Sequence, residues 1–196
     1  MVNFVPDFVI KESLKMSVNA SKVIFLDIDG VIKRNGSAMY CQFDSKQLAK
    51  DLTKKYKTDY KKYVREGLNV AYYDWDNQAI DRLKEIIRQT GAKIVISSSW
   101  KYHPLGLKRL IDFFRIYNLE KEIIGITENL GDGRYFSMEL KQNEILHYLD
   151  KYPHIESFVI IDDNEFNSDV SANFVQTDIL LSDENVIQCI QILNKK

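Results

Sequence analysis

Two aspartates, Asp27 and Asp29, follow an apolar run that ends at Leu26, and their spacing suggests chemistry at the end of a strand. Side chains alternate along a strand, so both carboxylates face one site while Ile28 points back to the core. Facing carboxylates can supply a nucleophile and a proton donor. A short Asp-x-Asp pattern also occurs in calcium loops and solvated turns, but a buried strand ending on it with glycine and valine following is rarer. Phosphoryl chemistry is therefore the first hypothesis.

Three more groups of polar residues stand where strands end or helices begin. The hydroxyls of Ser97 and Ser98 follow an apolar run, and the acidic pair Asp162 and Asp163 closes another. Lys141 lies near the start of a segment with helical spacing. Open parallel sheets place their ligands at the carboxyl ends of the strands. These residues are therefore expected to lie near the two aspartates.

Taken in order, these motifs resemble those of a known family. An Asp-x-Asp-Gly-Val sequence, a serine after a strand, a lysine at a helix start and a closing acidic pair are similar to the four motifs of the haloacid dehalogenase (HAD) superfamily of phosphohydrolases. The resemblance spans residues 22–181. The sequences Ser-Ser-Ser-Trp and Ile-Asp-Asp look most like those of small HAD domains associated with RNA repair proteins. The resemblance implies a Rossmann-like fold and phosphatase activity.

The resemblance also implies a role for each aspartate of the first motif. Asp27 would attack phosphorus and form an aspartyl-phosphate, which divides one difficult step into two. Asp29 would protonate the leaving group and then deprotonate the water that hydrolyses the intermediate. An aspartate at this second position separates the phosphatase-like members from the ATPase branch, which carries threonine there.

A divalent cation is expected at this site. A phosphomonoester is dianionic, so an anionic nucleophile can approach it only when charge is neutralised, and Mg²⁺ with oxygen ligands fits best. The predicted ligands are the carboxylates of Asp27 and Asp162, with Asp163 as a second or water-mediated ligand. The resemblance implies that the backbone carbonyl of Asp29 is a further ligand. The acidic pair alone would also suit a strand exit or a helix cap, and the first motif is what favours metal binding.

Two contacts to the phosphate are predicted, each with an alternative. Ser97 is expected to hydrogen-bond a phosphoryl oxygen, and Ser98 competes for this role because strand ends are predicted only to within a few residues. Lys141 is expected to pair with the transferring phosphoryl group. Arg134, further upstream, is the alternative cation.

Apolar runs alternate with helical patterns along the chain, which favours an α/β fold with crossover units. The prediction is a Rossmann-like central parallel sheet of about five strands, with helices on both faces and a small helical insertion after the first strand. Right-handed crossovers make the first strand central. The predicted strands are 22–27, 93–97, 122–126, 157–162 and 173–176, and the predicted helices are 76–89, a segment opened by Pro104, 139–151 and 182–193.

Residues 33–70 form the predicted insertion, a flap followed by a basic helix. Apolar side chains recur every four residues and lysines occupy many other positions, which predicts one amphipathic helix over residues 45–66 with Ser45 as its cap. So short a segment cannot close as a lid, so an open site and a macromolecular substrate are expected. A contact between the lysine face and a polyanion is one hypothesis, and a solvated face is the other.

The chain has 196 residues, of which 45% are hydrophobic, and a formal net charge of -1. This favours one domain over residues 1–196 and gives no global attraction to nucleic acid. No transmembrane run and no Sec-type signal are recognised. Cys41 and Cys189 lack metal-ligand spacing, which favours idle thiols in a reducing compartment. A cytoplasmic location is expected, with signal-independent secretion into a host left open.

Together these patterns predict a magnesium-dependent phosphomonoesterase that acts through an aspartyl-phosphate. The first hypothesis for its substrate is a phosphoprotein, including phosphotyrosine, because the site is expected to be open. A nucleotide or polynucleotide end phosphate is the second. A catalytically idle scaffold that serves as a binding module is the alternative from another class.

Overall fold

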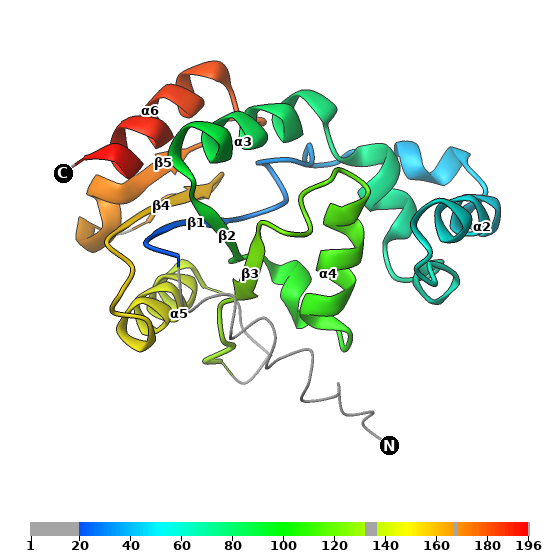
Figure 1. Cartoon of the computed structure of the whole chain (residues 1–196), viewed down its shortest axis with the longest axis horizontal. Coiled ribbons are helices and arrows are strands. Elements are labelled where there is room, and N and C mark those ends of the chain that lie inside the picture. Colours follow the sequence, from blue (N-terminus) through cyan, green and yellow to red (C-terminus); the bar gives the residue numbers. More distant parts are fainter. Residues whose placement is uncertain (1–19, 132–136, 167, 196) are drawn as a thin grey trace.

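The computed structural model describes residues 20–131, 137–166 and 168–195. Its centre is a sheet of five parallel strands in the order β3-β2-β1-β4-β5 (Figure 1). The first strand is central, as predicted, so an α/β, Rossmann-like architecture is confirmed. The strands are β1 (Lys22–Leu26), β2 (Lys93–Ile96), β3 (Ile123–Ile126), β4 (Ser157–Asp162) and β5 (Phe174–Gln176).

Helices cover both faces of this sheet. Figure 1 shows α3 and α6 on one side of the strands and α5 on the other. None of the helices within the described ranges is long and apolar enough to cross a membrane. The α-helices of the described residues are α2 (Ser45–Tyr56), α3 (Asn77–Thr90), α4 (Gly106–Arg115), α5 (Met138–Lys151) and α6 (Asp183–Asn194).

The alternation of side chains along β1 divides the core in two. Ile24 and Leu26 belong to the larger apolar cluster, which includes side chains of α3 and α6. Val23 and Phe25 face the other way and belong to the cluster that contains side chains of α5. The ring of Phe25 meets Tyr148 of α5 edge-on, with ring centroids 5.6 Å apart. The residue two positions after Phe25 is therefore directed to the α5 side.

Local signals fix most helix ends close to their predicted positions. Asp76 begins α3, because its carboxylate accepts a hydrogen bond from the backbone N–H of Ala79 at 2.8 Å. Gly91 ends the same helix in the left-handed conformation, with φ of 70°. The apolar spacing of the helix predicted over residues 139–151 favours Ile145, Leu146 and Leu149 as its packed side chains. This is wrong for Leu146, which is exposed, whereas Tyr148 is buried with Ile145 in the core.

The insertion after β1 differs from the single helix predicted over residues 45–66. α2 ends at Tyr56, because Lys57 adopts a left-handed conformation with φ of 55°. The chain then turns back, and the Thr53 hydroxyl accepts a hydrogen bond from the backbone N–H of Tyr60 at 3.0 Å. Asp44 rather than Ser45 caps the helix, and its carboxylate accepts from two backbone N–H groups. The predicted basic helix is thus shorter than expected.

The insertion is attached firmly to α4. The Tyr60 hydroxyl donates to the backbone carbonyl of Asp112 at 2.6 Å, and the Tyr63 hydroxyl donates to the Asp112 carboxylate at 2.7 Å. Both tyrosines and Asp112 are buried. Arg115 donates to the other carboxylate oxygen of Asp112 at 2.8 Å. A buried carboxylate needs such partners, so Asp112 holds the insertion against the side of α4.

Replacing Tyr63 with phenylalanine should therefore destabilise the protein. The variant keeps the ring and leaves one oxygen of the buried Asp112 without that donor, so the free energy of unfolding should fall by about 1–3 kcal/mol. Urea unfolding measures the change. Tyr72→Phe is the matched control, because Tyr72 is exposed, and a loss equal to that of Tyr63→Phe would contradict the role given to Asp112.

Candidate active site

Asp27, Ser97 and Asp162 lie level with one another at the carboxyl ends of three adjacent strands. The backbone N–H of Asp27 donates to the carbonyl of Ile161 at 3.0 Å, and that of Ser97 donates to the carbonyl of Leu26 at 2.9 Å. In each case, the side chain two positions earlier in the chain belongs to the apolar cluster that contains side chains of α5. The strands therefore direct all three side chains to the α5 side of the sheet.

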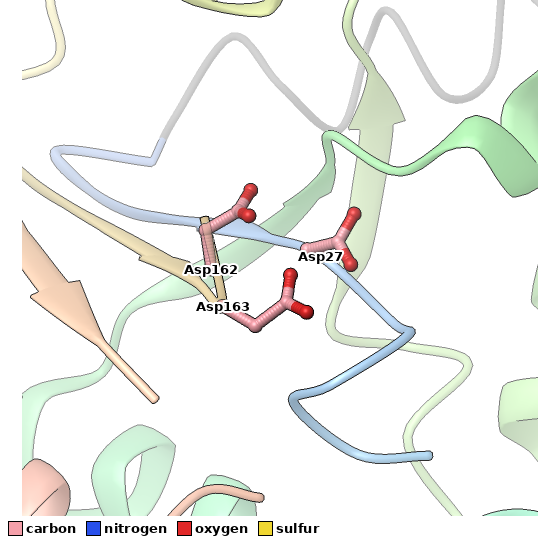
Figure 2. A group of neighbouring side chains, drawn as sticks. All are labelled: Asp27, Asp162 and Asp163. Atoms are coloured by element: carbon pink, nitrogen blue, oxygen red, sulfur yellow. The ribbon is translucent and has the colours of Figure 1, made fainter. Parts of the chain in front are cut away.

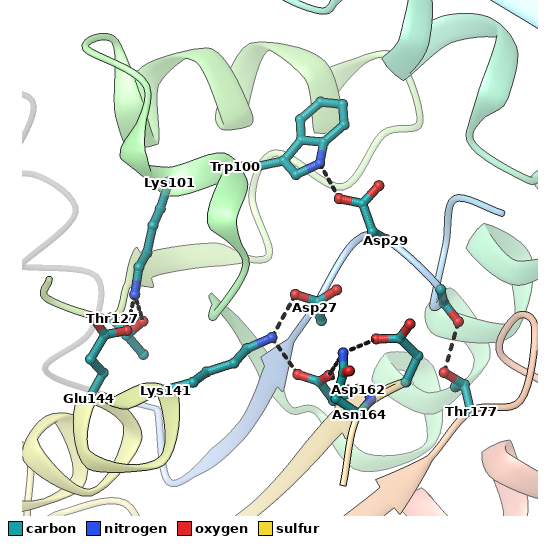
Figure 3. A network of polar contacts seen from close by, with 12 residues as sticks. Asp27, Asp29, Trp100, Lys101, Thr127, Lys141, Glu144, Asp162, Asn164 and Thr177 are labelled. Carbon is teal, nitrogen blue, oxygen red and sulfur yellow. Dashed lines mark hydrogen bonds and ion pairs between the residues drawn. The ribbon is translucent and has the colours of Figure 1, made fainter. Parts of the chain in front are cut away.

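Lys141 reaches this group from the first turn of α5 (Figure 3). Its Nζ lies 2.7 Å from Oδ1 of Asp27, and it also forms an ion pair with Asp162. The helix begins where Ser137 accepts a hydrogen bond from the backbone N–H of Leu140 at 3.1 Å, which sets the position of Lys141 one turn later. All three charged side chains are buried, so the ammonium group is held between two carboxylates away from water.

Burial changes the pKa values of these groups. It raises the pKa of Asp27 to about 7; the Asp162 carboxylate acts in the same direction, and Lys141 acts against it. Burial also raises the pKa of Asp162, again against the influence of Lys141. Burial alone would lower the pKa of Lys141, but the two carboxylates outweigh it and raise that pKa, so the lysine stays charged. One cation thus faces a surplus of acidic groups.

The acidic surplus fits a divalent cation. Asp27, Asp162 and Asp163 each offer a carboxylate oxygen, and these oxygens lie within 4.8 Å of one another (Figure 2). Hard cations such as Mg²⁺ prefer oxygen ligands of this kind. The side chain of Asp29 is outside this group, so the predicted contribution of Asp29 to the metal rests on its backbone carbonyl.

Gly30 makes room for the acidic pair. Its φ is 73°, and a Cβ at this position would lie 2.4 Å from Oδ2 of Asp163, so a side chain here would collide with a predicted metal ligand. The Thr177 hydroxyl donates to the Gly30 carbonyl at 2.8 Å and fixes the turn from the side of β5. The glycine of the first motif thus has a steric function as well as a conformational one.

Two asparagines that the sequence did not single out orient Asp163. Asn164 donates from its side chain to Oδ1 of Asp163 at 2.6 Å, and its backbone N–H donates to Oδ1 of Asp162 at 3.0 Å. Asn35, in the segment that leaves the first motif, donates to Oδ2 of Asp163 at 2.8 Å. Asparagines are common in turns, so nothing in the sequence separated these two from ordinary turn residues.

The raised pKa of Asp27 leads to a prediction for the metal-free protein. The ordinary value of 3.8 applies to the unfolded chain, so between about pH 4 and pH 7 the unfolded chain releases a proton that the folded site retains. Stability should therefore fall as the pH rises through this window. Asp27→Asn cannot ionise, so its free energy of unfolding should not fall in this way. Relative to the wild type, the free energy of unfolding of the variant should therefore rise by a few kcal/mol from the lower to the upper end of the window. Urea unfolding in chelator measures the difference, and a difference that is constant with pH would contradict the prediction.

Asp29 is oriented differently from the other acids. The indole Nε1–H of Trp100 donates to its Oδ2 at 2.8 Å (Figure 3). The Nζ of Lys33 lies 2.7 Å from Oδ1 of Asp29. Its side chain is 35% exposed, whereas the whole of Asp27 is only 6% exposed. Asp29 is therefore more open to solvent than Asp27, as expected for the group predicted to protonate a leaving group.

The serine hydroxyls are candidates for binding phosphate oxygens. Ser97 and Ser98 are both buried, and among the described residues neither hydroxyl has a hydrogen-bond partner. An unpaired buried hydroxyl is costly, which favours a ligand. Alternation along the chain directs Ser97 to the same side as Asp27 and Ser98 to the opposite side, so Ser97 is favoured. Arg134, the alternative to Lys141, lies outside the described residues.

A second buried lysine was missed from the sequence. Lys101, in the short turn at Ser99–Tyr102, forms an ion pair with Glu144 and donates to the Thr127 hydroxyl at 2.6 Å. Burial lowers the pKa of Lys101, and Glu144 acts against this. Glu144 lies one turn after Lys141 on α5, so this pair ties the loop after β2 to the helix that carries Lys141. In the sequence, Lys101 is a single lysine after a run of serines, and no pattern there predicts its contact with Glu144.

The structure has a parallel sheet with an aspartate directly after its central strand, and a serine, a lysine and an acidic pair surround that aspartate. This combination defines a domain of the HAD superfamily. A family model described as the HAD domain in Swiss Army Knife RNA repair proteins matches residues 23–186. The chain belongs to this family, and the resemblance carried by the four motifs is confirmed. No match was found among curated proteins or among solved structures. The family supports a phosphatase or phosphoesterase activity in general terms.

Proposed function

We propose that the protein is a magnesium-dependent phosphomonoesterase that works through an aspartyl-phosphate. The observation that carries this proposal is the contact between Lys141 and Asp27 beside two further carboxylates, at the end of the central strand. A carboxylate nucleophile held by a buried cation is suited to attack phosphorus. When bound by Asp27, Asp162 and Asp163, Mg²⁺ would supply the positive charge that offsets that of the phosphate.

The proposed reaction has two steps, and each step uses both Asp27 and Asp29. In the first, an oxygen of Asp27 forms a bond to phosphorus while the bond from phosphorus to the leaving oxygen breaks, and Asp29 gives that oxygen a proton. In the second, Asp29 takes a proton from water, the water oxygen bonds to phosphorus, and the bond to Asp27 breaks to release phosphate. Lys141 and Ser97 stabilise charge on the non-reacting oxygens throughout.

For the substrate we propose the terminal phosphate of an RNA strand. The sequence alone favoured a phosphoprotein first, because an open site was expected, but an open site suits either macromolecule. The family setting in RNA repair proteins is the specific observation that favours RNA. The exposed lysines of α2 add support, since lysines along one helix suit a phosphate backbone. They are Lys46, Lys50, Lys54 and Lys55.

Hydrolysis of a matched series of substrates tests this proposal. An oligoribonucleotide with a terminal phosphate should exceed a mononucleotide and a phosphopeptide in kcat/KM by at least about tenfold, because binding energy comes from the surface around the site. Chelation should abolish the reaction and Mg²⁺ should restore it. A preference for the phosphopeptide would overturn the choice of RNA, and no turnover of any monoester would favour an idle binding module.

Charge reversal on α2 tests the surface contact. Changing two of these lysines, Lys46 and Lys50, to glutamate should weaken hydrolysis of the oligonucleotide, more so at low salt, and leave hydrolysis of a small aryl phosphate nearly unaffected. Lys121→Glu with Lys195→Glu is the control, because both lysines are exposed elsewhere. Equal losses for the two variants would mean that only overall charge matters.

Asp29→Asn should affect poor leaving groups more than good ones. The variant lacks the proton donor, so kcat/KM for an alkyl phosphate should fall on the order of 10²- to 10⁴-fold, and far less for an aryl phosphate with an acidic phenol. A series of phosphate esters of graded leaving-group acidity measures this dependence. A uniform loss across the series would show that Asp29 serves another purpose.

A further inference from the structure

Trp100 connects the insertion to Asp29. Its indole N–H donates to Asp29, and the far edge of its ring faces Gly67 in the insertion, where an added Cβ would lie 3.6 Å from Cζ3. The ring also packs against Trp75, with centroids 5.7 Å apart, and against Phe113 of α4 at 6.3 Å. Trp100 therefore spans the distance from the anchored insertion to the candidate acid and base.

Arg109 fixes Trp100 in this position. Its guanidinium donates to the backbone carbonyl of Trp100 at 2.7 Å and to that of Glu66, in the insertion, at 2.8 Å. The same group lies over the Trp100 ring, 5.5 Å from its centroid. Arg109 is buried, so a rigid cation holds both the backbone and the ring of Trp100.

The two donors to Asp29 differ in how well they can orient it. Lys33 contacts Oδ1 through a four-carbon stem and three rotatable N–H donors, whereas Trp100 contacts Oδ2 through a planar ring packed against its neighbours. An indole N–H is a donor only, so it can hold the carboxyl group without exchanging a proton with it. The rigid contact is the one suited to set the direction of Asp29.

We propose that Trp100 is a positioning residue for Asp29, and that the insertion acts on the reaction through it. This inference rests on the proposed function, because it assigns to Trp100 a part in the proton transfers of Asp29. A misdirected acid loses much of its effect even when its chemistry is intact. The insertion thus helps to orient Asp29 through a series of contacts that runs from Glu66 to Arg109 and from Arg109 to Trp100.

Trp100→Phe tests the contact, because it keeps a packed ring and removes the N–H. In the wild-type background it should lower kcat/KM for an alkyl phosphate by about 10- to 100-fold, with a much smaller loss for a good aryl leaving group. In the Asp29→Asn background the same change should have almost no further effect. Tyr152→Phe is the control: its ring packs against Tyr148 at the end of α5, with centroids 4.6 Å apart, away from Trp100 and Asp29, so activity should stay within about threefold of the wild type.

Two outcomes of this cycle would overturn the inference. One is an unchanged rate for Trp100→Phe, and the other is an equal loss with and without Asp29, which would show that Trp100 acts elsewhere. A wild type that hydrolyses no monoester contradicts the proposed function itself, and the inference falls with it. Should Trp100→Phe not fold, a benzothiophene analogue of tryptophan at position 100 keeps the bicyclic shape and lacks the N–H.

Nuclear magnetic resonance reads the contact without activity. Trp75 and Trp100 are the two tryptophans of the chain, so two indole N–H signals are expected, and Trp75→Phe assigns them. Asp29→Ala removes the acceptor and should shift the Trp100 signal upfield while that of Trp75 stays in place. An unmoved Trp100 signal would overturn the contact even if the enzyme proves active.

Discussion

Asp27→Asn should abolish turnover while the protein stays folded. An amide cannot form the aspartyl-phosphate, and removal of an essential nucleophile costs several orders of magnitude, about 10⁴-fold or more in kcat. The site around Asp27 carries excess negative charge, so losing one carboxylate should not unfold the chain. Initial rates on an aryl phosphate and thermal unfolding measure the two effects.

Two results would contradict this expectation. Turnover close to that of the wild type would exclude covalent attack by Asp27. The second result concerns the intermediate. When the Asp29→Asn variant turns over a substrate with a good leaving group and is rapidly quenched, mass spectrometry should find the phosphoryl group on the peptide that contains Asp27. A phosphoryl group on another peptide would show that another residue is the nucleophile.

Lys141→Met should be damaging in both stability and activity. The variant keeps the length of the side chain but leaves Asp27 and Asp162 without the cation between them, and breaking a buried ion pair in this way costs about 3–5 kcal/mol. Activity should fall by about 10²- to 10³-fold because the phosphoryl oxygens lose a fixed charge. Urea unfolding and initial rates at saturating Mg²⁺ measure the two losses.

A control for Lys141 lies on the same helix. Lys151 forms an exposed ion pair with Glu128, and Lys151→Met should change stability by less than about 1 kcal/mol and leave activity unaltered. Lys141→Ala should also be more damaging than Arg134→Ala. The reverse ranking would assign the phosphate contact to Arg134.

The sheet and the centre of the site could be predicted from sequence because their signals are local. The apolar run before Asp27 identifies a buried strand, and alternation then determines which way Asp27 points. The same logic holds for Ser97 and Asp162, each at the end of its own apolar run. Right-handed crossovers place β1 centrally, so these three residues had to converge once the strands were recognised.

The insertion and its contacts could not be predicted in the same way. Lysine rarely adopts the left-handed conformation that ends α2 at Lys57, and the spacing of apolar residues continues past it. Tyr60 and Tyr63 are buried because Asp112, far along the chain, accepts their hydrogen bonds. The contacts of Trp100 and Lys101 likewise depend on partners distant in sequence, which periodicity does not reveal.

The hydrogen bonds that join the insertion to Asp112 have a consequence for the kinetics. In many enzymes that act on small substrates, a cap opens and closes on the microsecond to millisecond timescale, and this motion limits turnover. An insertion whose tyrosines are buried against α4 cannot swing on that timescale without breaking part of the core. Turnover should therefore not wait on a movement of this segment, and its limiting step is expected to be phosphoryl transfer, hydrolysis of the aspartyl-phosphate or departure of a product.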